Sequence, residues 1–242
     1  MLARAFTILG VFRPGDGELT LAEIGRRTGL AKATAHRLLG ELQLLGVVER
    51  TSGGVRLGLR LFELGQLVPR QRDLLEVAGP FLNDLREATR QTVHLAVLDG
   101  ADVVYVQKLS GHRGPEIPSR LGGRMPAYCT AVGKALLAFS PPELTESVLA
   151  GAPRRRTPRT VVAPGLIRVE LAAIRRRGVA QEHEESAPGI ACVAAPILDE
   201  NQAPVAAVSI TGWAGRLDAR RLAPTVRTTA LGVGRLLRPS GH

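Results

Sequence analysis

The side chains best suited to contact nucleic acid lie together at the start of one segment, residues 31–45. An apolar stripe recurs along this segment at helical spacing, at Ala35, Leu38, Leu39, Leu42 and Leu45. The opposite face carries Lys32, Ala33, Thr34, His36 and Arg37. An arginine such as Arg37 can donate twice to guanine, Thr34 can contact a base or a phosphate, and Lys32 a phosphate. The pattern predicts a recognition helix for the major groove; the alternative is a helical hairpin with a merely solvated polar face.

Three further elements must position that helix. The spacing predicts a first helix within Leu2–Phe12 and a second over Leu21–Thr28, which Thr20 caps with Glu23 in a capping box. After the third helix, Val47–Arg50 and Val55–Leu57 flank a Gly-Gly turn and predict a β-hairpin. The order helix, helix, helix, hairpin indicates a winged helix-turn-helix. Its wing would add two contacts to the DNA backbone, from Arg50 and Arg56.

Charge and length set wider bounds. The chain has 242 residues, and its 32 lysines and arginines against 22 acidic residues give a formal net charge of +10. Such an excess favours polyanionic partners, because neutralised phosphates release counterions. The alternative is a GC-rich genome that encodes arginine freely. The length allows either one large domain or two modest ones.

The second half alternates strands and helices. A helix is expected within Leu59–Val68, and Pro69 with the charged residues after it predicts a domain boundary near residue 69. Gly79 and Pro80 are expected to interrupt the chain before a helix from Phe81 to Thr89. Beyond it, hairpins are predicted at 92–108 and 190–211, and helices at 131–139, 141–149 (capped by Ser140), 165–177 and 218–237. Antiparallel hairpins between helices indicate the α+β class, not a doubly wound parallel sheet.

The same sequence gives expectations about compartment and cofactors. Met1 runs directly into an amphipathic stretch without a cleavage site, and no apolar run approaches the ~20 residues that cross a bilayer. We therefore expect a cytoplasmic protein with no membrane contact and with Cys129 and Cys192 reduced. The two cysteines lack a zinc-finger spacing, and no metal or cofactor is expected.

Three segments resemble one known family. Residues 19–50 (LTLAEIGRRTGLAKATAHRLLGELQLLGVVER) resemble the DNA-binding domain of IclR-type regulators. Residues 122–139 (GGRMPAYCTAVGKALLAF) and 175–212 (RRRGVAQEHEESAPGIACVAAPILDENQAPVAAVSITG) resemble the family's effector domain. The resemblance implies a winged helix-turn-helix domain at 1–68, a linker helix for dimerisation at 69–79 and a GAF-like effector-binding domain with an antiparallel sheet at 80–242. It also implies a transcription regulator that acts as a repressor. Such proteins bind palindromic double-stranded DNA as homodimers or dimers of dimers, under control of a small organic effector, often a carboxylate or aromatic acid.

The resemblance also implies an effector pocket at Ala131, Val132, Gly133, Glu182, Ile190, Cys192, Ser209 and Thr211. The residue types are compatible with that role. Residues 130–133 begin a predicted helix, whose free amide groups and dipole suit an anion. Ser209 and Thr211 lie two apart on a strand and so share a face. Cys192 shares the face of Ile190 and supplies a weak donor in an apolar wall.

Each of these positions also has a plainer interpretation. Cys192 can be a small buried hydrophobe, Ser209 and Thr211 can face solvent on an edge strand, and the run from Glu182 to Glu185 can be a solvated loop. Tyr128 belongs either to an aromatic-ligand site or to the core. The family often has Asp where this chain has Glu182, a carboxylate that would repel an acid ligand unless it is protonated or hydrogen-bonded.

Two other functions compete with the regulator. An enzyme would need a thiol–imidazole pair, from Cys129 or Cys192 with His94 or His183, for which no spacing gives support. A constitutive DNA-binding protein would use its second domain only for dimerisation. We expect no catalysis, because no P-loop, dinucleotide fingerprint or metalloprotease motif is present.

Overall fold

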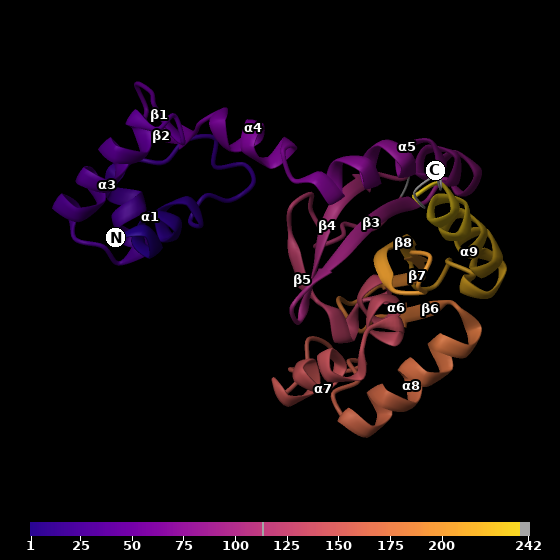
Figure 1. Ribbon diagram of the computed structural model, residues 1–242. Helices are drawn as coiled ribbons and strands as arrows, with labels where there is room; N and C mark the ends of the chain where they lie inside the picture. Colours follow the sequence, from indigo (N-terminus) through magenta and orange to yellow (C-terminus); the bar gives the residue numbers. More distant parts are fainter. Residues whose placement is uncertain (113, 238–242) are drawn as a thin grey trace. The chain divides into compact units, whose positions relative to one another are not determined.

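The computed structural model describes residues 1–112 and 114–237 (Figure 1). The chain divides into two compact units, Met1–Arg72 and Asp73–His242. The boundary lies three residues beyond the predicted one, within a helix, so most of the predicted linker segment 69–79 belongs to the second unit.

The first unit contains four helices and one hairpin in the predicted order. They are α1 (Leu2–Leu9), α2 (Leu21–Thr28), α3 (Lys32–Leu44), β1 (Val48–Arg50), β2 (Val55–Leu57) and α4 (Arg60–Gln66). The two strands pair antiparallel. The core of this unit is formed by Ile8, Leu19, Ile24, Leu38, Leu39, Leu42, Val48 and Val55. The winged helix-turn-helix expected from the sequence is therefore present.

Local chemistry sets the limits of α2. The Thr20 side chain accepts a hydrogen bond from the amide of Glu23, as the capping-box pattern predicts. The Glu23 carboxylate, however, pairs with Arg26 and Arg27. At the other end Gly29 has φ +71°, the left-handed conformation that ends helices at little cost for glycine. α3 can therefore begin only three residues later, at Lys32.

The second unit is built on one six-stranded sheet. Its strands are β3 (Thr92–Asp99), β4 (Asp102–Leu109), β5 (Arg124–Pro126), β6 (Ala180–His183), β7 (Ile190–Leu198) and β8 (Pro204–Trp213). Their order across the sheet is β5-β4-β3-β8-β7-β6, and every neighbouring pair is antiparallel. The predicted α+β class with an antiparallel sheet is confirmed. β8 lies between β3 and β7, which places Ser209 and Thr211 at the centre of the sheet.

Helices cover both faces of this sheet. They are α5 (Pro69–Thr89), α6 (Ala131–Phe139), α7 (Pro142–Ala150), α8 (Pro164–Arg177) and α9 (Ala219–Leu236), with a short 3-10 helix η1 (Ala127–Cys129) before α6. One face packs its apolar side chains with α5 and α9, through residues such as Leu82, Val193 and Val226. The other face packs with α6 and α8, through residues such as Ala194, Leu136 and Ile174. Figure 1 shows α9 and α6 on opposite sides of β7 and β8.

Several predicted details are wrong. Gly79 and Pro80 do not interrupt the chain, since α5 continues through Pro80 to Thr89. A proline inside a helix costs about 3 kcal/mol. Burial of a helically spaced row, Leu74, Ala78, Leu82 and Leu85, outweighs that cost.

Ser140 does not cap α7, because its hydroxyl donates back to the carbonyl of Leu136 at the end of α6. The strands β5 and β6 were not predicted, because each is short and lacks an apolar alternation. Their places in the sheet depend on pairing with distant strands.

Candidate functional site

The front of α3 is exposed and polar, as the sequence predicts. Lys32, Ala33, His36 and Arg37 are exposed and Thr34 is half-buried. Behind them, four members of the apolar stripe are buried in the core of the unit, at Ala35, Leu38, Leu39 and Leu42. The fifth is not, because α3 ends at Leu44 and Leu45 lies beyond the packed turn with 68% of its surface exposed. The candidate DNA-contacting side chains thus lie on a face held rigidly from behind.

Weak surface partners hold the candidate arginines in place. The Arg37 guanidinium lies 2.5 Å from the Glu41 carboxylate, one turn along α3. On the hairpin, Arg56 pairs with Glu49 at 2.7 Å, and Arg50 Nε donates to Gln43 Oε1 at 2.8 Å. Exposed ion pairs of this kind contribute about 0–1 kcal/mol. Each arginine can therefore exchange its present partner for a phosphate or a base at small cost.

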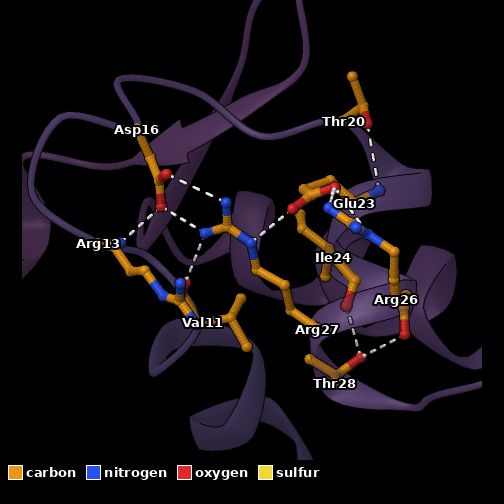
Figure 2. A network of polar contacts seen from close by, with 10 residues as sticks. Val11, Arg13, Asp16, Thr20, Glu23, Ile24, Arg26, Arg27 and Thr28 are labelled. Atoms are coloured by element: carbon orange, nitrogen blue, oxygen red, sulfur yellow. Dashed lines mark hydrogen bonds and ion pairs between the residues drawn. The ribbon is translucent and has the colours of Figure 1, made fainter.

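A network centred on Arg27 fixes α2 against the loop that precedes it (Figure 2). The Arg27 guanidinium donates to both carboxylate oxygens of Asp16, to Glu23 Oε1 at 2.7 Å and to the carbonyl of Val11. Hydrogen bonds from Arg27 hold the pKa of the Asp16 carboxyl below its usual value, and those from Arg26 and Arg27 do the same for Glu23. The network orders the support on which α3 rests.

In the second unit, seven of the eight predicted pocket residues line one cavity. They come from α6, β6, β7 and β8 and are Ala131, Val132, Glu182, Ile190, Cys192, Ser209 and Thr211. The eighth, Gly133, does not line it. Its amide donates to Thr130 Oγ1, and its Cα packs so tightly on η1 that a Cβ would lie 2.2 Å from the carbonyl oxygen of Ala127. Gly133 thus shapes the start of α6 without facing the cavity.

Sequence reasoning missed half of the cavity wall. The remaining lining residues are His94, Tyr105, Ile117, Pro118, Met125, Thr130 and Ser186. His94 pairs with Ser209 across β3 and β8, a contact between residues more than a hundred positions apart. In the sequence, the only sign of this role is that His94 is an imidazole side chain within a mainly apolar strand segment. Tyr128, by contrast, belongs to the core, and its hydroxyl bonds to the backbone of Arg154.

A chain of polar contacts crosses the cavity wall. Cys192 Sγ lies 3.1 Å from Thr211 Oγ1, which lies 3.3 Å from His94 Nδ1, and His94 Nε2 lies 2.8 Å from Ser119 Oγ. Burial lowers the pKa of His94 to about 3, and burial together with the charge of Glu182 raises the pKa of Cys192 well above its usual value. Both groups are therefore neutral near pH 7, the opposite of a thiolate–imidazolium pair. The geometry gives hydrogen-bond partners to a ligand and no activated nucleophile.

Glu182 contributes the only carboxyl group of the cavity lining. Its side chain is buried on β6, so the interpretation of residues 182–185 as a solvated loop is wrong. Oε1 accepts from the amides of Glu185 and Ser186 and from the Ser186 hydroxyl. Oε2 is buried and has no partner among the described residues. Burial raises the pKa of this carboxyl.

A buried lysine fixes the loop beside that carboxyl. Lys134 on α6 is fully buried, and its Nζ lies 2.6 Å from both Glu170 Oε1 and Glu185 Oε1. Burial alone would lower the pKa of Lys134, but the charges of Glu185 and Glu170 outweigh it and raise that pKa. Lys134 therefore stays charged and is already committed to two carboxylates. It offers no free positive charge to a ligand.

The start of α6 supplies the donors that the lysine does not. Thr130 caps the helix by accepting from the amide of Gly133. Ala131 and Val132 belong to the first turn of the helix and line the cavity, and their amides have no protein acceptor among the described residues. The enclosed space is only about 20 Å³, roughly the room that one water molecule needs. A larger ligand requires the wall to open, and Ile117 and Pro118 on the loop after β4 form part of that wall.

Within the described ranges, no group of three or more His, Cys, Asp and Glu side chains is arranged to hold a metal ion. None of the described helices is long and apolar enough to cross a membrane.

Two family models together cover most of the chain. One, described as the IclR helix-turn-helix domain, matches residues 1–52. The other, described as the C-terminal part of the bacterial transcriptional regulator IclR, matches residues 66–235.

Similar proteins agree with these matches. The transcriptional regulator XynR of Escherichia coli is 35% identical over 223 residues, which cover 91% of this chain and 88% of that protein. The glycerol operon regulatory protein of Streptomyces coelicolor is 36% identical over 218 residues, 89% of this chain and 85% of that protein.

Two solved structures resemble the whole chain. An IclR homologue from Microbacterium hydrocarbonoxydans, solved in complex with 4-hydroxybenzoate, has a TM-score of 0.91 and 32% identity, with 98% of both chains covered. The IclR protein of Thermotoga maritima has a TM-score of 0.80 and 33% identity, also with 98% of both chains covered. The relatives named here are transcription regulators, not enzymes.

Proposed function

The chain belongs to the IclR family of bacterial transcriptional regulators, and from that premise we propose that it is a repressor controlled by a small hydroxylated aromatic acid. DNA binding through the first unit and effector binding through the second follow from family membership. The effector's chemistry, the site residues and the direction of control are our proposal. We further propose that it acts in the cytoplasm without a cofactor, as a homodimer or dimer of dimers on a palindromic operator.

One observation carries the effector proposal: the cavity lining combines helix-start amide donors with a buried carboxylate oxygen that has no donor among the described residues. The amides of Ala131 and Val132, in the positive field of the α6 N-terminus, suit a carboxylate. Glu182 Oε2 has no donor and suits a ligand hydroxyl. The Tyr105 ring and the apolar side chains of Met125 and Ile190, which also line the cavity, suit an aromatic ring. The 4-hydroxybenzoate bound to the Microbacterium homologue has this combination of groups.

The small cavity implies a mechanism of control. An aromatic acid does not fit the closed wall, so its binding selects conformations in which the loop bearing Ile117 and Pro118 has moved. Such an effector binds the open state better than the closed one, and only that difference can change DNA affinity. In this mechanism, effector binding alters the DNA affinity of the first unit through a change of conformation.

The proposal is tested by thermal unfolding in the presence of benzoate, 4-hydroxybenzoate and 4-hydroxybenzamide. A ligand at 100 times its dissociation constant stabilises the protein by about 2.7 kcal/mol. We expect 4-hydroxybenzoate to raise the midpoint most, since benzoate lacks the donor for Glu182 and the amide lacks the charge for α6. Ser209→Ala and Cys192→Val should reduce the shift. If no acid of the panel shifts the midpoint, the aromatic-acid proposal is wrong and a constitutive DNA-binding protein becomes the better interpretation.

A further inference from the structure

The second unit has a groove that shares no lining residue with the effector cavity. Three arginines without partners in the described chain line this groove. Arg177 ends α8, and Arg220 and Arg227 lie two turns apart on α9. Between them lie Val179, Gln181 of β6 and Leu231, and we call this feature the α9–β6 groove. No ion pair or side-chain hydrogen bond of these three arginines is present in the described chain, and no acidic residue lines the groove. The surface therefore carries an uncompensated positive charge around an apolar floor.

The groove lies beside backbone that is free to form hydrogen bonds. β6 is the last strand of the sheet and pairs only with β7, so its outer edge has no strand partner in the described chain. On the opposite wall, Pro224 lies inside α9 and has no N–H, which deprives the carbonyl of Arg220 of its helical donor. An unpaired strand edge is a template for an extended chain.

These features favour one kind of occupant. Carboxylates suit arginine guanidinium groups, which bind them through two parallel hydrogen bonds. Val179 and Leu231, the latter 51% exposed, form an apolar floor. Such a floor suits apolar side chains at every second position of an extended peptide. We propose that the α9–β6 groove docks an extended acidic segment of a partner protein. Gln181 faces this groove while its neighbour Glu182 faces the effector cavity, so both sites share one strand.

The experiment measures fluorescence anisotropy of a fluorescein-labelled octapeptide of alternating Glu and Val with the full-length protein. The test variant carries Arg177→Ala, Arg220→Ala and Arg227→Ala. The matched control carries Arg176→Ala, Arg221→Ala and Arg235→Ala, which lie on the same two helices but do not line the groove and remove the same charge. We expect the test variant to bind about tenfold more weakly or worse, since it loses three charge-assisted contacts, and the control to stay within about twofold. All six side chains are on the surface, so circular dichroism should report intact folding in both variants.

Three comparisons decide what occupies the groove. The same peptide with Gln for Glu should bind much more weakly, and one with alternate backbone amides methylated should also lose affinity if the edge of β6 pairs with it. Undetectable binding of the Glu peptide, or equal losses in the test and control variants, overturns the proposal. So does a short DNA duplex whose affinity falls in the test variant and stays unchanged in the control, because the groove would then be a nucleic-acid surface.

Discussion

Arg37 is the side chain on α3 for which the structure allows the sharpest test. It is exposed, lies on the polar face of the helix and is held by the surface carboxylate of Glu41 and a weak contact with the Met1 sulfur. If Arg37 reads a base, Arg37→Ala should weaken binding to the preferred sequence by about 1–3 kcal/mol and relax specificity at one position. Selection from a random duplex library, followed by titration of the selected and scrambled duplexes, measures both effects. Equal losses on the two duplexes would make Arg37 a phosphate contact, which is our expectation for Arg56.

Lys134 makes a second residue-scale prediction, this time about stability. Removing its ammonium in Lys134→Met leaves the buried Glu185 without its partner, and breaking a buried pair from one side costs about 3–5 kcal/mol. Urea unfolding followed through Trp213 reports on this unit. Adding Glu185→Gln should restore part of the loss, because the second substitution removes the uncompensated charge. A Lys134→Met protein as stable as the wild type would mean that water reaches this site.

The sequence predicted the role of a single residue where that role depends on its neighbours along the chain. It did not do so where the role depends on packing against distant segments. Spacing along one segment was enough to predict that Thr20 caps α2 and that Cys192 shares a strand face with Ile190, whereas the resemblance implied that this face lines the pocket. His94 and Lys134 could not be assigned in that way. The role of His94 depends on pairing with β8, and that of Lys134 depends on carboxylates supplied by α8 and by the turn after β6.

At the scale of elements, the same contrast holds. The longer apolar helices and strands were predicted within a few residues, because their periodicity comes from one buried face. β5 and β6 were missed, and β6 carries Glu182. A four-residue strand with charged side chains has no signal of its own, and only its partner β7 makes it a strand.

Glycines at two helix starts give a matched prediction about packing. Gly133→Ala places a Cβ against the carbonyl of Ala127, which is backbone and cannot move aside, so overpacking should cost about 1–3 kcal/mol or more. Gly165→Ala, near the start of α8, meets open space and should be neutral or stabilising by up to about 1 kcal/mol. Chemical unfolding of both variants checks the contrast. Similar effects in the two would mean that the start of α6 is packed less tightly than the structure has it.

The Arg27 network predicts how the support of α3 responds to acid. Asp16 and Glu23 have lowered pKa values in the folded unit, so their contribution to stability is present above their unfolded pKa values. It is lost as the pH falls through the lowered, folded values. Arg27→Gln should therefore speed hydrogen–deuterium exchange in peptides covering residues 11–28 at neutral pH, and the difference from wild type should shrink below pH 4.

Arg26→Gln is the control for that measurement, because the Arg26 side chain is 78% exposed and pairs with Glu23 alone. It should change the exchange much less than Arg27→Gln at every pH. If the two variants behave alike, the contacts of Arg27 with Asp16 and Val11 do not order the loop before α2.

At the scale of the whole molecule, the net charge of +10 does not by itself show that the protein recognises a DNA sequence. Charge attracts any DNA and makes binding fall steeply with salt, whether or not a site is recognised. Control by an effector requires the two units to communicate. Linkage makes that requirement quantitative, because an effector that lowers DNA affinity by some factor must itself bind the DNA complex more weakly by the same factor.

We therefore predict that an acid identified by thermal unfolding lowers affinity for the selected duplex by about 5–150-fold, and that the duplex lowers affinity for the acid equally. Titrating the duplex with and without acid, and the acid with and without duplex, measures both factors. Ser209→Ala should weaken acid binding, and so raise the acid concentration needed for the effect, and leave DNA affinity without acid unchanged, since Ser209 lies in the effector unit and Arg37 in the other. If the loss of DNA affinity keeps growing with acid concentration and reaches no plateau, the acid competes for the DNA-binding surface and control through a second site is wrong. If Ser209→Ala needs no more acid than the wild type for the same effect, the acid binds outside this cavity, and the amides of α6 and the Oε2 atom of Glu182 do not hold it.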